Sequence, residues 1–218
     1  MAKPMGLLLA GMNYSPVSEE EFHAWYDTEH VPERLRVKGF VNAERWLGAD
    51  DPKISIATYD LDTLDVLTSP AYTSIAGANL SPWSKRMTGG IRRICRLEAE
   101  QTLPGRQAAP DNAAGLLLNA MNVAPEAEAE FNKWYNEVHV KELCALPGFE
   151  SVTRYKINVQ ALPPSDKPRF QYFAIYELSD QQQALESMGK HAKNLTQTDA
   201  SGPGGIAAVG HVVFEFAK

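Results

Sequence analysis

The chain has 218 residues, of which 44% are hydrophobic, 9% aromatic and 22% charged, as in ordinary folded proteins with an apolar core. A net charge of −6, without a run of Lys and Arg, disfavours nucleic acid and anionic membranes as partners. The two cysteines have neither a disulfide pattern nor metal-type spacing, and the first residues lack the apolar stretch of a signal peptide. We therefore expect a cytoplasmic protein that binds neither nucleic acid nor a membrane.

The sequence contains a long internal repeat. Residues 6–46 align with 115–155 without a gap, and 18 of these 41 positions are identical. Both copies contain Gly-Leu-Leu-Leu, Phe-x-x-Trp-Tyr, His-Val and Gly-Phe in the same order. A repeat of this length indicates two whole domains rather than a solenoid of short units. We predict domains over 1–98 and 114–218, joined by a linker over 99–113 that is rich in Pro, Gly and polar residues.

The first half of each copy predicts a strand followed by a helix. In the first copy, the apolar run over 6–14 is short enough for a strand, and apolar residues at helical spacing follow over 18–30. Ser18 and Glu21 form a capping box that marks the start of this helix. Pro32 predicts a kink or break just after His30, with a short helical piece to about Val37.

The second half of each copy predicts a hairpin, a second helical region and a last strand. In the first copy these cover 40–48 with 53–60, then 62–78, then 90–98. In the second copy, the hairpin turn runs through 162–166, the helical region covers 180–195 and the last strand 205–216. The order β-α-β-β-α-β is that of the ferredoxin-like motif, so the predicted fold class is α+β with two tandem ferredoxin-like domains.

A four-stranded sheet of this kind has helices on one face only. The Gly-Leu-Leu-Leu strands are apolar on both faces, so the uncovered face needs a partner. We expect the two repeats to supply it to each other, packing sheet to sheet as a pseudo-dimer within the chain. A further homodimer stays open.

One helix segment of each copy resembles the EthD-like branch of the dimeric α+β barrel superfamily. The segments are Phe22-His-Ala-Trp-Tyr-Asp-Thr-Glu-His30 and Phe131-Asn-Lys-Trp-Tyr-Asn-Glu-Val-His139, and a Gly-Phe pair follows each of them. The resemblance covers nearly the whole chain as two fused units. It implies an intramolecular barrel, with a small apolar ligand held between sheet and helices beside one or two proton-moving side chains. The superfamily includes isomerases, cofactor-free monooxygenases, polyketide cyclases and haem-dependent enzymes, so the fold alone does not imply one activity.

Tyr26 and His30 are four residues apart and therefore share one helix face, as do Tyr135 and His139. Histidine beside a phenol suits general acid/base chemistry, because its pKa lies near neutrality. The structural alternative is that His30 caps the broken helix with its ring while Tyr26 packs on the sheet.

Asn13 and Asn122 end the first strands, and we expect them to hydrogen-bond a carbonyl or enolate oxygen of the ligand. Only the first copy carries acids beside its histidine, at Asp27 and Glu29. The N-terminal site is therefore the active one if catalysis needs a carboxylate to orient the imidazole. Alternatively, these acids are solvated helix surface.

Arg45 and Arg154 occupy equivalent positions on the second strands. They are candidates for bidentate binding of a carboxylate ligand, although ion pairs with Glu33 and Glu142 are favoured. The remaining candidate ligand-binding residues are Glu29, Tyr72 and Trp83. Because the predicted turn Ser81-Pro-Trp-Ser84 has no counterpart in the second copy, the two pockets should differ.

The sequence lacks a glycine-rich phosphate loop and a serine elbow, which disfavours nucleotide enzymes and serine hydrolases. A metal site is not predicted, because the sequence neighbours Asp27, Glu29 and His30 point to different sides of the helix. We predict a cofactor-independent enzyme acting on a small apolar or aromatic molecule by His-mediated proton transfer, of isomerase, cyclase or lyase type. The alternatives are a non-enzymatic small-molecule-binding or accessory protein, an oxygen-using monooxygenase, and a haem protein of the same fold.

Overall fold

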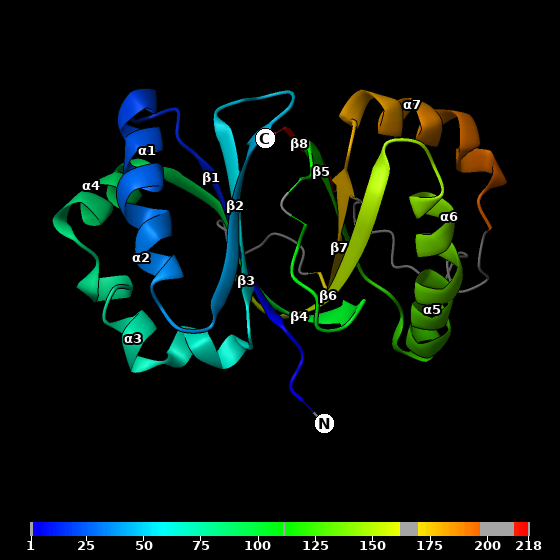
Figure 1. The fold of residues 1–218 in the computed structure, drawn as a ribbon, viewed down its shortest axis with the longest axis horizontal. Coiled ribbons are helices and arrows are strands. Elements are labelled where there is room, and N and C mark those ends of the chain that lie inside the picture. Colours follow the sequence, from blue (N-terminus) through cyan, green and yellow to red (C-terminus); the bar gives the residue numbers. More distant parts are fainter. Residues whose placement is uncertain (1, 111, 162–169, 197–211, 218) are drawn as a thin grey trace. The chain divides into compact units, whose positions relative to one another are not determined.

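The computed structural model describes residues 2–110, 112–161, 170–196 and 212–217. The chain has a mixed α+β structure that divides into two compact units (Figure 1). Unit 1 comprises Met1–Gln101, Gly105–Ala109 and Ile157–Lys167, and unit 2 comprises Thr102–Pro104, Pro110–Lys156 and Pro168–Lys218. The domain bounds proposed from the sequence stay a prediction.

Unit 1 contains a four-stranded antiparallel sheet. Its strands are β1 (Gly6–Asn13), β2 (Phe40–Gly48), β3 (Ile54–Leu61) and β4 (Arg92–Leu103), and pairing gives the order β4-β1-β3-β2. The first strand and the hairpin agree with the sequence prediction. The last strand is longer than predicted, because Ala99 and Glu100 pair with β1. Residues 99–103 are therefore strand rather than linker.

The first helical segment of unit 1 is continuous. It consists of α1 (Glu19–Trp25), the π-helical turn η1 (Tyr26–His30) and α2 (Val31–Leu35). Its predicted start is confirmed, because the Ser18 hydroxyl accepts a hydrogen bond from the Glu21 amide at 3.3 Å. The helix does not break after His30, and the predicted short helical piece beyond it is confirmed as α2. Pro32 is the second residue of α2, which follows the π-helical turn directly, so the helical segment continues through this proline.

The second helical region of unit 1 differs from the prediction of one helix over 62–78. It is divided into η2 (Leu64–Thr68), α3 (Pro70–Thr73), η3 (Gly77–Asn79) and α4 (Pro82–Gly90). The segment Ser81-Pro-Trp-Ser84, predicted as a turn, is the start of α4. The Ser81 hydroxyl accepts from the Ser84 amide at 2.9 Å, and serine followed by proline is a favoured helix N-terminus.

Unit 2 repeats the element order. Its elements are β5 (Gly115–Met121), η4 (Pro125–Ala127), α5 (Glu128–Trp134), η5 (Tyr135–His139), α6 (Val140–Cys144), β6 (Phe149–Ala161), β7 (Tyr172–Leu178), α7 (Gln181–His191), η6 (Ala192–Asn194) and β8 (Val212–Ala217). The antiparallel order is β6-β7-β5-β8. The helical region predicted over 180–195 is confirmed. The predicted turn over 162–166 and residues 205–211 of the last strand lie outside the described residues.

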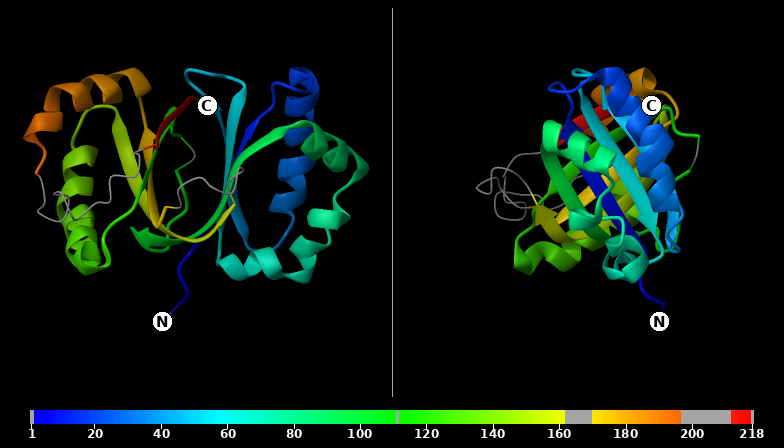
Figure 2. Two further views of the ribbon diagram at one scale, coloured as in Figure 1. Left: turned by 180° about the vertical axis from the view of Figure 1, so that it is seen from behind. Right: turned by 90° about the vertical axis from the view of Figure 1, so that its left-hand side faces the viewer.

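In each unit the helices cover one face of the sheet, as Figures 1 and 2 show. The core of unit 1 between helices and sheet includes Phe22, Trp25 and Tyr26, and that of unit 2 includes Phe131 and Tyr135. Within the described part of the chain, no helix is long and apolar enough to cross a membrane.

Gly148 provides a test of this packing in unit 2. It has a φ of +90°, and a Cβ atom there would lie 2.3 Å from the Ala184 amide nitrogen of α7. We expect Gly148→Ala to lower the free energy of unfolding by at least about 2 kcal/mol, measured by urea denaturation. Gly189→Ala is the matched control, because a Cβ there meets no atom within 4 Å in the interior of α7. It should raise stability by roughly 0.5–1 kcal/mol, and equal effects of the two substitutions would contradict this account.

Candidate functional site

The predicted tyrosine and histidine pairs occupy the π-helical turns. In η1 the Val31 amide donates to the Tyr26 carbonyl five residues earlier, and in η5 Val140 donates to Tyr135 in the same way. Lys141 stands where the first copy has Pro32, so the π-turn does not depend on proline. Such turns occur frequently at functional sites.

The π-turn brings together rings that an α-helix would keep apart. Trp25 and His30 are five residues apart, yet their ring centroids lie 4.3 Å from each other, and Trp134 stacks on His139 at 4.7 Å. The tyrosine of each pair meets the imidazole edge-on, at 5.1 Å in unit 1 and 4.9 Å in unit 2. Each histidine is therefore enclosed between a tryptophan and a tyrosine of its own helix.

Both imidazoles are held in the neutral form. His30 is only 9% exposed and His139 is half-buried, and in both rings Nδ1 has no hydrogen-bond partner among the described residues. Burial lowers the pKa of His30 well below its usual value and lowers the pKa of His139 to about 4. Within the described part of the chain, the His30 ring makes no hydrogen bond to a helix carbonyl, so the predicted capping role is not observed.

A second tyrosine from the sheet completes each cluster. Tyr135 and Tyr176 hydrogen-bond through their hydroxyl groups, while the Tyr26 hydroxyl donates to the sulfur of Met12 at 3.4 Å. The Tyr59 hydroxyl is buried and interacts with Tyr26. Burial raises the pKa of Tyr59 to about 12 and the pKa of Tyr26 and Tyr176 well above 10. All four phenols thus stay protonated and can donate hydrogen bonds.

Tyr59 and Tyr176 were missed in the sequence analysis, although a signal for them exists. The segments Ala57-Thr-Tyr-Asp-Leu61 and Ala174-Ile-Tyr-Glu-Leu178 match, but at a spacing of 117 (174 − 57) instead of 109 (115 − 6). The longer hairpin of the second copy shifts the spacing, so an alignment without a gap does not find the match.

The two arginines of the second strands lie over the helix tyrosines. The Cζ atom of Arg45 is 4.4 Å from the Tyr26 ring centroid, and that of Arg154 is 3.9 Å from Tyr135. Arg45 forms an ion pair with Asp27 at 2.5 Å and contacts Nδ1 of His23 at 2.7 Å. The Asp27 side chain is 65% exposed, so Asp27 is a solvated acid of the helix surface that also pairs with Arg45.

The predicted ion pairs of these arginines with Glu33 and Glu142 are wrong. Glu33 pairs with Arg34 at 3.1 Å, and Glu142 accepts hydrogen bonds from Thr196. The prediction failed because the rotation of the helix over the strand decides which acid faces the arginine. That rotation depends on tertiary packing.

The structure does not bring the strand asparagines to the histidines. Oδ1 of Asn13 accepts from the amide and hydroxyl of Ser15, at 3.0 and 2.6 Å, and thereby shapes the loop after β1. Successive strand residues point to opposite faces, so Asn13 points away from the face on which Met12 contacts Tyr26. Oδ1 of Asn122 similarly accepts from the Gln171 amide at 2.8 Å.

Glu29 joins α4 to the π-turn rather than contacting the imidazole. Its Oε1 accepts from the hydroxyls of Ser81 and Ser84, at 2.5 and 2.9 Å, and Ser84 Oγ accepts from Trp25 Nε1 at 2.9 Å. Neither acid beside His30 therefore contacts its ring. The N-terminal copy was favoured only if a carboxylate orients the imidazole, and the structure shows no such contact among the described residues.

The other two candidate ligand-binding residues have structural contacts. Tyr72 is buried and stacks on Phe40, with ring centroids 5.7 Å apart. The Trp83 indole donates to Oε1 of Glu21 at 3.1 Å. These contacts fasten the helical region before β4 to the rest of unit 1.

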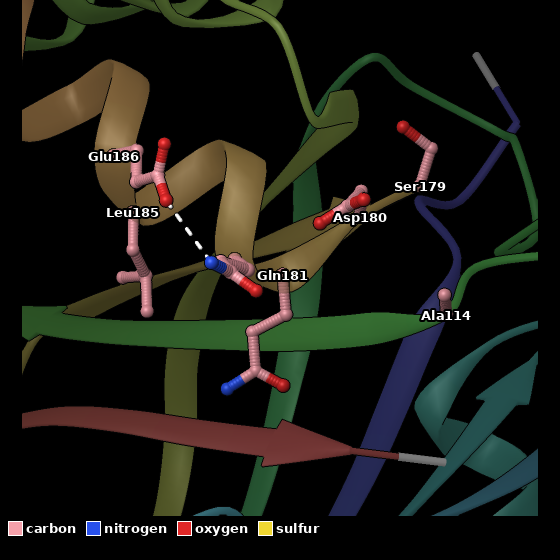
Figure 3. Close-up of a pocket in the computed structure, with 7 residues that line it drawn as sticks. Ala114, Ser179, Asp180, Gln181, Leu185 and Glu186 are labelled. Carbon is pink, nitrogen blue, oxygen red and sulfur yellow. Dashed lines mark hydrogen bonds between the residues drawn. The ribbon is translucent and has the colours of Figure 1, made fainter.

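A pocket of about 570 Å³ opens at the start of α7 in unit 2 (Figure 3). It is lined by Ala114, Ser179, Asp180, Gln181, Gln182, Leu185 and Glu186. None of the residues predicted for the functional site lines it.

The depressed pKa of His139 predicts that stability depends on pH. The folded protein binds this proton less readily than the unfolded chain, so the neutral ring is compatible with folding above pH 6.5. Stability is then lost as the pH falls from 6.5 towards 4. The shift corresponds to a loss of about 3 kcal/mol at most. We expect His139→Asn to reduce the loss of unfolding free energy between pH 7 and pH 4.5, measured by urea denaturation. An unchanged pH dependence in the variant would refute this assignment.

Comparison with known proteins yields a partial family match. The model of a family described as a domain of unknown function (DUF4286) matches residues 117–201. No curated protein matches the chain.

Solved structures match over nearly the whole chain. An anthrone oxidase-like protein is 9% identical, with 98% of this chain and 94% of that chain covered and a TM-score of 0.61. A Fusobacterium nucleatum protein provisionally named a monooxygenase is 12% identical, with coverages of 100% and 93% and a TM-score of 0.63. A chlorite dismutase mutant from Candidatus Nitrospira defluvii is 11% identical, with coverages of 100% and 92% and a TM-score of 0.59. At such identities the likeness shows the fold alone.

Proposed function

We propose that this protein is a cofactor-independent enzyme that moves a proton on a small apolar or aromatic molecule. The observation that carries the proposal is the neutral imidazole with a buried Nδ1 that lacks a hydrogen-bond partner among the described residues, set beside buried phenols in a π-turn that both copies contain. A neutral imidazole can accept a proton, and a protonated phenol can donate a hydrogen bond to the oxygen on which negative charge develops.

The geometry favours unit 2 as the working copy. His139 is half-buried, whereas His30 is enclosed in a core where Trp25 and Tyr26 are both fully buried. We assign His139 as the base and the Tyr135–Tyr176 pair as the donor. This changes the expectation from the sequence, which assigned His30 as the acid/base with Tyr26 and Asn13 assisting, and the second copy as a second or vestigial site.

The proposed step transfers a proton from an acidic C–H group of the ligand to His139. The electron pair of the broken C–H bond moves to a conjugated carbonyl oxygen, which the phenol pair stabilises by hydrogen bonding. If the proton returns to another carbon, the net reaction is an isomerisation. In a cyclisation the carbanion attacks a second carbonyl carbon of the ligand, whose oxygen takes the proton. In an elimination the electron pair expels a leaving group on the adjacent carbon, which takes the proton with it. No oxidant is required.

The finer assignments from the sequence belong to the same proposal. Membership of the EthD-like branch is supported by the two helix motifs. We also propose that the two units are tandem ferredoxin-like domains that pack sheet to sheet as an intramolecular dimeric α+β barrel. The strand order of unit 1 supports this arrangement. So does the burial of Leu7, Leu9 and Trp46, which lie on the sheet face that the helices of unit 1 do not cover. A further homodimer remains an additional proposal.

Haem does not fit the described surroundings of the histidines. The Trp25 ring lies against His30 and the Trp134 ring against His139, where an axial imidazole would need to face a wide cavity.

An oxygen-using reaction is the second candidate function, favoured by the names of the anthrone oxidase-like and monooxygenase neighbours. A non-enzymatic binding or accessory role is the third.

Anthrone is a suitable probe, because its methylene protons are acidified through conjugation with the carbonyl group. Exchange of these protons for deuterium under argon, followed by NMR, reports proton transfer alone. We expect the wild-type protein to accelerate exchange and His139→Asn to remove about 10²–10⁴-fold of that acceleration. His191→Asn, which changes an exposed histidine at the end of α7, is the control and should leave the rate unchanged.

The possible outcomes separate the candidates. Loss of exchange in His30→Asn but not in His139→Asn would move the site to unit 1. Anthrone binding without exchange would favour the non-enzymatic role. Anthrone consumption only in air, with uptake of oxygen, would favour the oxygen-using reaction.

A further inference from the structure

Arg154 is a buried charge without a counter-charge. Its side chain is 0% exposed, and no described carboxylate forms an ion pair with it. Its Nη1 and Nη2 atoms donate to the amide oxygens of Asn136 and Asn132, at 2.5 and 2.9 Å, while Nε has no partner among the described residues. Because arginine remains charged in proteins and buried charges are normally paired, this arrangement requires an explanation.

Unit 1 shows how the same position is neutralised. Arg45 lies over the corresponding tyrosine, but its Nη1 meets the carboxylate of Asp27 at 2.5 Å. Asn136 occupies the position of Asp27 in the second copy. The change from acid to amide preserves the hydrogen bond to the guanidinium and removes the negative charge.

The two amide oxygens stand where a bound carboxylate would place its own oxygens. Asn132 and Asn136 are one helical turn apart and accept from the two terminal nitrogens of one guanidinium, which is the bidentate pattern of arginine–carboxylate pairs. Both asparagines are half-buried, so they form the outer side of the cluster. The inner side is aromatic, with the rings of Tyr135, Phe131 and Tyr172 at 3.9, 5.6 and 5.7 Å from Arg154 Cζ.

We infer that unit 2 takes an aromatic carboxylate, which displaces the amide oxygens and supplies the counter-charge that Arg154 lacks. This inference rests on the proposed function and names the substrate class of the same site. Unit 1 does not bind such a ligand through Arg45, because Asp27 already occupies the guanidinium.

A bound carboxylate would also adjust the proposed base. Arg154 contributes to lowering the pKa of His139, so a negative charge at Arg154 weakens that effect. The pKa of His139 would rise when the ligand is bound, although burial, the largest cause of its lowered value, would continue to hold it below the usual range. The imidazole would become a stronger base only when substrate is present.

Benzoate is the probe for this site, with benzyl alcohol as the neutral control. We expect calorimetric titration of the full chain to show saturable benzoate binding that benzyl alcohol does not reproduce. The test variant Asn136→Asp restores the acid found in unit 1. It should raise the melting temperature without ligand and weaken benzoate binding by at least about tenfold. The matched control Gln183→Glu adds the same charge at an exposed residue of α7 and should leave binding unchanged.

NMR of the histidine ring protons supplies a second readout, in which benzoate should raise the pKa of His139 in the wild-type protein. The inference is overturned if benzoate does not bind at millimolar concentrations, if benzyl alcohol binds as well, or if Asn136→Asp binds benzoate as tightly as the wild type. His139→Asn should still bind benzoate. Absence of anthrone exchange together with specific benzoate binding would therefore reject the proposed function while supporting the carboxylate site.

Discussion

The π-helical turn is the constraint on which the helix–sheet interface of each unit depends. By replacing the usual hydrogen bond with one that spans five residues, it places Trp25 over His30 and Trp134 over His139. The tyrosine that begins each turn then faces the sheet. π-turns are rare, and this one occurs both with a following proline and without one. Aromatic packing against the sheet, rather than a local backbone restriction, therefore maintains it.

The two copies use this frame with different charges. Each has a strand arginine beneath a helix tyrosine, a neutral histidine and a second tyrosine from the sheet. In unit 1, Asp27 neutralises the arginine, and Glu29 is engaged by the serines of α4. In unit 2, asparagine replaces the first acid, and the arginine is buried with neutral acceptors only. One copy is thus electrostatically complete, while the other retains an unbalanced positive charge beside its histidine.

This difference connects stability with function. Keeping the charge of Arg154 in a low-dielectric environment costs free energy, and keeping His139 neutral does so as the pH falls below 6.5. Such costs are typical of sites in which a ligand provides the missing interaction. In unit 1 the corresponding arginine pairs with Asp27, which suits a supporting role.

The sequence by itself determined the features that depend on local chemistry. The repeat, the first strands, the hairpin of unit 1, the serine cap at Ser18 and the proximity of Tyr26 to His30 follow from spacing, periodicity and capping over a few residues. The helix start at Ser81 was also encoded locally, although its proline suggested a turn instead.

Only the tertiary structure decided how the elements face one another. It joined Tyr59 and Tyr176 to the helix clusters, because strands distant in sequence carry them and the hairpin lengths differ. It paired Arg45 with Asp27 instead of Glu33, because the π-turn sets the rotation of the helix over the strand. It also left Arg154 without an acid, which depends on the side chains that surround one buried guanidinium rather than on any local pattern.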